Sequence, residues 1–314
     1  MVRVLVTGAS GFVGRHLASL LVASREYEVW GTGKTVLPPG SAIASKQFLT
    51  ADLVGGLDPQ FIAIAAPDVV VHLAGAASVG RSWRYVEESL DSSVVGAVAL
   101  HSAMRDAGVK LRRWIDIGSS EEYFPSELPL TEESLTLPTN PYGFGKLAQA
   151  RTLQYLCSRD NIEFVHFRPF NHIGPGQSLG FVIPDWADQI IRLLREHNAC
   201  GRIRVGNIDV ERDFVDVRDV VRAYTAAIDG KVPPGTYNVS SGVPRSLRAV
   251  FEEMTVIAGV TASVESDQEL DRPSDARIRI GDSSKLASAC SWRPKIAWHD
   301  SLRDVLGYFA QIGG

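Results

Sequence analysis

The stretch from Val2 to Gly14 reads VRVLVTGASGFVG, an apolar run that ends in a turn with glycines at positions 8, 11 and 14. A continuous apolar run is typical of a parallel strand that is buried on both faces. The residues after the turn have helical spacing, and a helix N-terminus presents free N–H groups and a positive dipole end to an anion. The stretch therefore predicts a strand–turn–helix unit that binds the pyrophosphate of a dinucleotide.

Strand-like and helical segments alternate along the first half of the chain. We expect further strands at residues 28–32, 46–49, 68–73, 113–118 and 163–168, with helices at about 85–107 and 142–159. This alternation predicts an α/β fold, a Rossmann-type doubly wound parallel sheet with helices on both faces. Two more helices are expected at 184–197 and 247–258. We expect residues 1–170 to form a dinucleotide-binding Rossmann domain, and residues 171–314 to form mostly a smaller C-terminal α/β substrate lobe with some segments returning to the main sheet.

The composition is that of an ordinary soluble globular protein: 314 residues, 45% hydrophobic and 22% charged, with a net charge of −4. This charge does not favour nucleic acid or an anionic membrane as a partner. No apolar stretch approaches the roughly 18 residues that span a bilayer, and the apolar start is too short for a signal peptide. The three cysteines have no metal or disulfide spacing. We expect a cytoplasmic protein with reduced thiols and no bound metal.

The remaining cofactor contacts are expected where the second, third and fourth strands end. The segment Gly31-Thr-Gly-Lys34 has no acidic residue to bind the ribose hydroxyls of NAD, whereas Lys34 suits a 2′-phosphate. NADPH is therefore favoured, and NADH remains open. Asp52 is expected either to accept a hydrogen bond from adenine or to cap a helix. The expected cofactor contacts are Gly8, Ser10, Gly11, Phe12, Val13, Gly14, Thr32, Lys34, Asp52, Leu53, Leu73, Ala74, Gly75, Tyr142 and Lys146.

Tyr142 and Lys146 form the candidate chemical site, because residues four apart on a helix face the same way. A free tyrosine has a pKa of about 10, and we expect the nearby ammonium to lower it. Ser119 and Ser120 follow the fifth strand, where a hydroxyl can hydrogen-bond a substrate carbonyl or alkoxide. Glu121 lies beside them and is suited to orient sugar hydroxyls, to remove a proton from carbon, or to serve only as a loop charge.

Five motifs together resemble the extended short-chain dehydrogenase/reductase family, and the resemblance covers essentially the whole chain. They are TGxxGxxG at 7–14, Asp52-Leu53, HLAG at 72–75, GSSEEY at 118–123 and Tyr142-x-x-x-Lys146. The resemblance implies an NAD(P)H-dependent oxidoreductase whose catalytic residues are Ser119, Tyr142 and Lys146, with Glu121 beside them. It also implies a homodimer that pairs through the helices near 85–107 and 142–159.

Two segments of the second half, FRPFNHIGPGQSLGFV at 167–182 and VGNIDVERDFVDVRD at 205–219, are similar to the GDP-6-deoxy-4-keto-D-mannose reductase branch of that family. This similarity implies reduction of the C4 ketone of a GDP-linked 4-keto-6-deoxyhexose, GDP-4-keto-6-deoxy-D-mannose, to GDP-D-rhamnose. A GDP-6-deoxy-D-talose-forming reductase, a nucleotide-sugar 4,6-dehydratase or 4-epimerase, and a non-catalytic dinucleotide-sensing module remain alternatives. The implied substrate contacts are Ser120, Asn171, Phe181, Val182, Asn207, Arg212 and Arg272.

Overall fold

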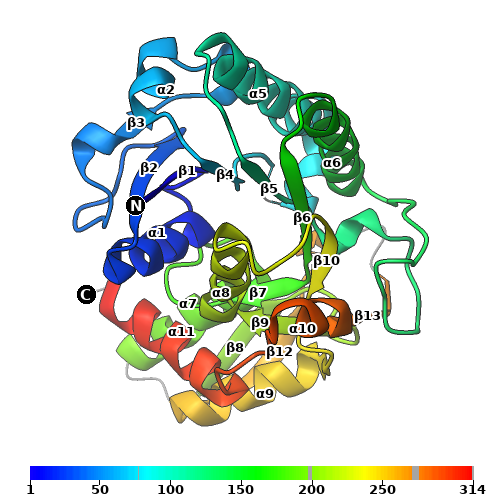
Figure 1. The fold of residues 1–314 in the computed structure, drawn as a ribbon. Coiled ribbons are helices and arrows are strands. Elements are labelled where there is room, and N and C mark those ends of the chain that lie inside the picture. The colour runs from blue at the N-terminus through cyan, green and yellow to red at the C-terminus, as the bar shows by residue number, and fades with distance from the viewer. Residues whose placement is uncertain (77, 197–199, 271–275, 313–314) are drawn as a thin grey trace.

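A seven-stranded sheet, parallel throughout, forms the centre of the larger part of the molecule (Figure 1). The computed structural model describes residues 1–76, 78–196, 200–270 and 276–312. The strand order is β10-β6-β5-β4-β1-β2-β3, so the chain winds outward in both directions from β1 and β4. The expected doubly wound Rossmann-type fold is confirmed. The strands are β1 (Val2–Thr7), β2 (Tyr27–Gly33), β3 (Phe48–Thr50), β4 (Val69–His72), β5 (Arg113–Ile117), β6 (Glu163–Pro169) and β10 (Gly235–Val239).

Helices cover both faces of this sheet, because successive side chains of each buried strand point to opposite sides. Val4 and Val6 of β1 pack in the core on the side of α1 (Phe12–Ser24) and α8 (Val217–Ile228). Leu5 packs in the opposite core, under α2 (Pro59–Ala65), α5 (Gly96–Asp106) and α6 (Pro141–Arg159). Among the described residues, no helix combines the length and apolar character needed to cross a membrane.

The helix expected at 85–107 is not one regular α-helix. It consists of α4 (Val86–Leu90), a π-helical turn η3 (Asp91–Val95) and α5. A π turn holds one extra residue and changes the direction of the side chains that follow it. Small residues allow α6 to pack closely here, since a Cβ added at Gly145 would lie 3.2 Å from the Ser93 hydroxyl oxygen. The expected strand at 46–49 also differs, because it begins as the 3₁₀ turn η1 (Ser45–Gln47) before β3.

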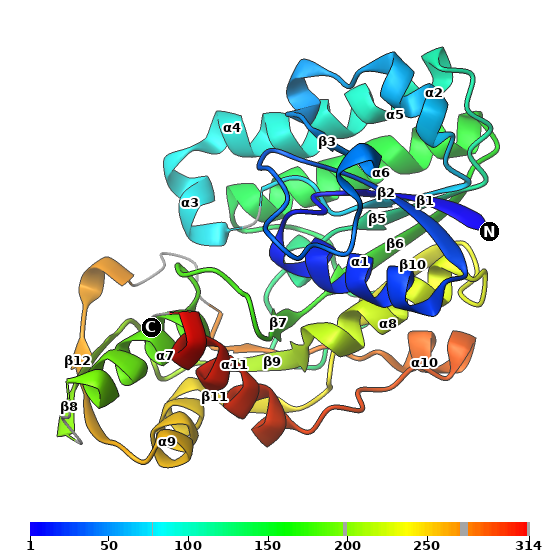
Figure 2. The same ribbon diagram turned by 90° about the vertical axis from the view of Figure 1, so that its left-hand side faces the viewer.

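The smaller lobe contains three long helices around a second apolar core (Figure 2). Two of them were predicted, and Leu247–Ala258 has the expected bounds. The three long helices of the smaller lobe are α7 (Val182–Arg195), α9 (Leu247–Ala258) and α11 (Trp298–Ile312). Its strands are β7 (Asn171–Ile173), β8 (Cys200–Val205), β9 (Glu211–Asp216), β11 (Pro244–Ser246), β12 (Thr261–Ser266) and β13 (Ile278–Arg279). The remaining elements are α3 (Val79–Arg84), α10 (Ser284–Cys290), η2 (Leu53–Gly55), η4 (Ser120–Glu122) and η5 (Gln268–Leu270).

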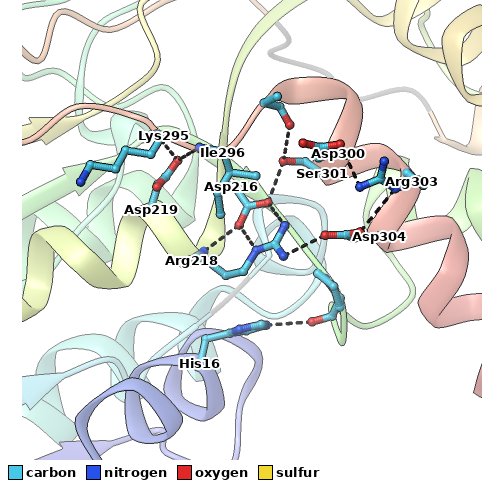
Figure 3. A network of polar contacts seen from close by, with 12 residues as sticks. His16, Asp216, Arg218, Asp219, Lys295, Ile296, Asp300, Ser301, Arg303 and Asp304 are labelled. Atoms are coloured by element: carbon cyan, nitrogen blue, oxygen red, sulfur yellow. Dashed lines mark hydrogen bonds and ion pairs between the residues drawn. The ribbon is translucent and has the colours of Figure 1, made fainter. Parts of the chain in front are cut away.

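Polar contacts join the smaller lobe to the helices of the sheet, as Figure 3 shows. Asp216, at the end of β9, accepts hydrogen bonds from Arg218 of α8 and from the Ser301 hydroxyl of α11 at 2.7 Å. Arg218 also donates to Asp304 of α11 at 2.8 Å. On the other side of this junction, the His16 ring of α1 hydrogen-bonds the carbonyl of Pro175 at 2.8 Å. The His16 contact fixes the loop after β7 against α1, and the other contacts hold α11 against β9 and α8.

Candidate active site

A cleft of about 550 Å³ opens at the carboxyl ends of the strands, where β1 and β4 lead to opposite halves of the sheet. Ligands bind at this switch point in open α/β sheets. Every expected cofactor contact lines the cleft, together with Ser119, Ser120, Glu121, Asn171, Phe181 and Val182. Asn207 and Arg212 do not line it. Arg272 lies outside the described residues.

The glycine turn fits a dinucleotide pyrophosphate. Gly11 caps α1 without a side-chain hydrogen bond, and the first turn of α1 contains no acidic residue. The free N–H groups of that turn therefore remain available at the wall of the cleft. The turn is also tightly packed, because a Cβ added at Gly14 would lie only 2.2 Å from the Gly8 carbonyl oxygen.

Lys34 and Asp52 form an ion pair at the far end of the cleft, with 2.9 Å between the Lys34 Nζ and an Asp52 carboxylate oxygen. Both side chains are about half exposed, at 55% and 50%. The hydrogen bond from Lys34 lowers the pKa of Asp52. The other carboxylate oxygen accepts from the Val54 N–H at 3.2 Å, so Asp52 also caps η2, as one of its two expected roles requires. A cation lies where a 2′-phosphate is expected.

Thr7 and His72 shape the end of β4, which forms another wall of the cleft. The Thr7 hydroxyl accepts from the Ala74 N–H at 3.1 Å and contacts the His72 Nδ1 at 2.9 Å. Burial lowers the pKa of His72 to about 4, so the ring is neutral near pH 7 and its Nδ1 can accept from the hydroxyl. The backbone of Leu73 to Gly75 is thereby fixed where the cofactor is expected.

Local sequence explains why α6 begins beside the Ser119 turn. Asn140 is the N-cap, and its side-chain oxygen accepts from the Gly143 N–H at 2.9 Å. Pro141 occupies the first helical position, where its missing N–H costs nothing. Gly143 permits a close approach, since a Cβ there would lie 2.2 Å from the Glu121 carbonyl oxygen. Tyr142 is thus placed next to Ser119.

The expectation of a lowered tyrosine pKa is wrong. Burial raises the pKa of Tyr142 above its ordinary value of 10, although its hydrogen bond with Ser119 acts in the opposite direction. The Lys146 ammonium instead donates to the Ile117 carbonyl at 2.9 Å. Burial lowers the pKa of Lys146, while Asp116 and Glu122 act to raise it. The phenol is therefore neutral near pH 7, which is the form that can donate a proton.

Glu121 anchors the turn to the smaller lobe. One of its carboxylate oxygens accepts from the Asn140 side chain at 2.8 Å and lies 3.3 Å from an Arg279 nitrogen. Arg279, on β13, also donates to the Ser120 carbonyl at 2.7 Å. Of the three uses expected for Glu121, these contacts favour a charge that holds the loop in place over removal of a proton.

Two residues of the expected substrate site have other contacts. Asn207 is exposed, and its side chain accepts from the Asp209 N–H at 3.0 Å within the same turn. Arg212 is 9% exposed, and its guanidinium donates to the carbonyls of Glu211 and Ala276. The structure therefore does not bring these two side chains into the cleft.

Among the cleft-lining residues that sequence reasoning missed are His172, Gln177 and Tyr224. The His172 ring stacks on Phe12 with 6.1 Å between centroids, and Gln177 donates to the His172 carbonyl at 3.2 Å. His172 and Gln177 belong to the 167–182 motif that contains Asn171, so their place in that motif could have predicted that they line the cleft. The buried Tyr224 hydroxyl has no hydrogen-bond partner among the described residues, and nothing in the sequence distinguishes it from a core tyrosine.

Comparisons with known proteins agree with this geometry. The model of the NAD dependent epimerase/dehydratase family matches residues 4–240. The chain is 34% identical over 307 residues to GDP-6-deoxy-D-mannose reductase of Pseudomonas aeruginosa, covering 97% of this chain and 96% of that protein. It is 29% identical to GDP-6-deoxy-D-talose 4-dehydrogenase of Aggregatibacter actinomycetemcomitans, covering 90% of each chain. The structure of RMD from Pseudomonas aeruginosa complexed with NADPH superposes with a TM-score of 0.84, at 32% identity over 99% of both chains.

Proposed function

The chain belongs to the NAD dependent epimerase/dehydratase family, as its resemblance to extended short-chain dehydrogenases/reductases implied, and we propose that it reduces the C4 ketone of GDP-4-keto-6-deoxy-D-mannose to GDP-D-rhamnose. The observation that carries this proposal is the 34% identity to a GDP-6-deoxy-D-mannose reductase over nearly the whole of both chains. The convergence of Ser119, Tyr142 and Lys146 at one cleft supports it.

In this proposal each residue of the cleft has a separate task. Bound NADPH supplies the hydride. Tyr142, a neutral phenol, donates its proton to the oxygen on which negative charge develops. The Ser119 hydroxyl donates a hydrogen bond to the same oxygen and so stabilises that charge. Lys146 is on the same face of α6 and is suited to hold the nicotinamide ribose. The walls of the cleft orient the ketone next to the cofactor.

NADPH is the proposed cofactor, and NADH remains possible. A relative of known structure is described as complexed with NADPH. Lys34 and the absence of an acidic residue at the end of β2 agree with a 2′-phosphate. We also propose that residues 1–170 serve mainly the cofactor and residues 171–314 mainly the GDP-sugar, with Asn171, Phe181 and Val182 at the border of the two.

A homodimer is proposed as the working form. Apolar side chains are exposed on α4 and α6, two helices that pack against each other, and they include Leu90, Phe144 and Tyr155, the last of which is 68% exposed. An exposed apolar patch is typical of a protein–protein interface. We further propose a cytoplasmic location, with which three free cysteines agree.

Product analysis tests the proposed function. The protein is incubated with freshly prepared GDP-4-keto-6-deoxy-D-mannose and either NADPH or NADH, and the nucleotide sugar is identified by NMR. Stoichiometric oxidation of NADPH with formation of GDP-D-rhamnose is expected. A 4-epimerase or a 4,6-dehydratase would leave this ketone and the NADPH unchanged, and would instead convert a 4-hydroxy nucleotide sugar such as GDP-D-mannose without net consumption of cofactor. Cofactor binding without turnover of either sugar would favour a sensing module.

One alternative has direct support. The 29% identity to a GDP-6-deoxy-D-talose 4-dehydrogenase favours a reductase that forms the C4 epimer, GDP-6-deoxy-D-talose, from the same ketone. The two products differ in the orientation of the C4 hydroxyl, and proton–proton couplings at C4 separate them.

A further inference from the structure

Four charged residues form a buried cluster under the Ser119 turn, and none of them lines the cleft. Asp116 of β5 and Glu122 of η4 are fully buried, and His166 and Arg168 of β6 are 2% and 4% exposed. Burying ionised groups is costly unless they are paired and hydrogen-bonded. Such a cluster directly behind a catalytic turn therefore invites a functional explanation.

Both nitrogens of the His166 ring face carboxylates. Nδ1 lies 2.8 Å from Asp116, and Nε2 lies 3.1 and 3.2 Å from the two oxygens of Glu122. A neutral imidazole has only one N–H, so both contacts can be hydrogen bonds only if the ring is protonated. Burial acts to lower the pKa of His166, but Glu122 and Asp116 outweigh it and raise the pKa to about 9.

The other charges around the ring complete a balanced set. Arg168 donates to Glu122 at 2.8 Å, so two carboxylates face two cations. On the far side of Asp116 lie Lys146 of α6 and the neutral His72 of β4.

The cluster is bonded directly to the catalytic turn. A Glu122 carboxylate oxygen accepts the Ser119 backbone N–H at 2.9 Å, while the Ser119 hydroxyl oxygen accepts from the Glu121 N–H at 3.1 Å. The cluster also leaves no space behind Gly118, where an added Cβ would lie 1.9 Å from Glu122 and 2.4 Å from His166. The position of the Ser119 hydroxyl therefore depends on where Glu122 is held.

We propose, on the basis of the function proposed above, that His166 is a positioning residue: held between Asp116 and Glu122, it keeps the Ser119 turn in the geometry that reduction of the substrate ketone requires. Deprotonation of His166 removes one N–H and leaves two buried carboxylates against a neutral ring. The Ser119 hydroxyl then loses its alignment with the developing charge.

Kinetics of the His166→Gln variant provide the first test. We expect kcat to fall by up to about 100-fold, the effect of a small misplacement of a catalytic group, while the KM values for keto sugar and NADPH stay roughly constant. In the wild type, kcat should fall as the pH rises through about 9, the pKa of His166, and this limb should be absent in the variant. His101→Gln is the matched control, because His101 is also buried against one carboxylate, Asp160, but Asp160 pairs with Arg159 and not with the Ser119 turn.

NMR provides the second test and needs no substrate. The His166 ring and the Ser119 amide should titrate together near pH 9 in the wild type. In Glu122→Gln, which can still accept the Ser119 N–H but lacks the charge, the shared midpoint should fall. Glu122→Gln also serves as the test variant if His166→Gln does not fold.

Any of three results would overturn the proposal. They are a titration midpoint of the His166 ring near pH 6.5, a Ser119 amide signal that does not change with pH, and a fall of kcat near pH 9 that persists in His166→Gln. Absence of any keto-sugar reduction by the wild type would count against the proposed function alone, since the two titrations would still decide the role of His166.

Discussion

Replacing Lys34 by Gln should reduce the affinity for NADPH and leave the affinity for NADH nearly unchanged. In the wild type the ammonium forms an ion pair with Asp52 at 2.9 Å, on side chains that are about half exposed. Exposed pairs of this kind contribute about 0–1 kcal/mol, and a hydrogen bond to a charged group contributes about 1.5–3 kcal/mol. Subtracting about 0.5 kcal/mol for the displaced pair leaves about 1–2.5 kcal/mol, which is roughly a 5- to 70-fold loss of NADPH affinity.

Fluorescence titration of both cofactors measures this effect. NADH has no 2′-phosphate, so its dissociation constant should change by less than about twofold, as expected for loss of one surface ion pair. Lys46→Gln is the matched control, because Lys46 is exposed, lies in η1 and does not line the cleft. An equal loss of affinity for NADPH and NADH would show that Lys34 contacts a part of the cofactor that both molecules share. An unchanged NADPH affinity would place the 2′-phosphate elsewhere.

Three further perturbations test other parts of the site. Tyr142→Phe should lower kcat by at least about 100-fold, the usual contribution of a general acid, while NADPH binding persists in the same titration. Gly14→Ala would place a Cβ 2.2 Å from the Gly8 carbonyl oxygen, so it should abolish NADPH binding and lower the free energy of unfolding in urea by about 1–3 kcal/mol. Gly307→Ala in α11 is the control and should have neither effect, because nothing lies within 4 Å of the added Cβ. The free energy of unfolding should also depend on His166: its pKa is raised from 6.5 to about 9, so its contribution is complete below pH 6.5 and is lost as the pH rises toward 9. Urea unfolding at a series of pH values should show this decline in the wild type and a flatter profile in His166→Gln.

The sheet could be predicted because its strands and helices carry strong periodic patterns. Residues 4–6 of the first strand form an apolar run, and Val4 and Leu5 enter the cores on opposite faces. Asn140 and Pro141 mark the start of α6 by ordinary capping chemistry. The smaller lobe was harder. Its strands β11 and β13 have three and two residues, too few for a period, and their partner β9 is distant in sequence.

The residues of the cofactor half of the cleft could be predicted from one geometric rule, which is that the carboxyl ends of parallel strands lie at the same edge of a sheet. The substrate half depended on resemblance instead. Asn171 and Phe181 line the cleft, but Asn207 and Arg212, taken from the same kind of motif, do not. The prediction that the pKa of Tyr142 is lowered was wrong, because spacing along a helix does not reveal how deeply a side chain is buried. The spacing also does not reveal that the Lys146 ammonium donates to the Ile117 carbonyl.

The buried cluster lies between what the sequence can and cannot predict. Asp116 and His166 interrupt apolar runs that a parallel sheet must bury on both faces, so each needed a polar partner inside the protein. In the structure the two residues are direct partners in the register of β5 and β6. A register derived from the ends of those two strands would have paired them. The third member, Glu122, comes from a 3₁₀ turn beyond the sheet, and only the fold brings its carboxylate to the other ring nitrogen. An unexplained charge in a buried strand is therefore a sequence signal for a buried ion pair, while the link from that pair to a catalytic turn requires the three-dimensional structure.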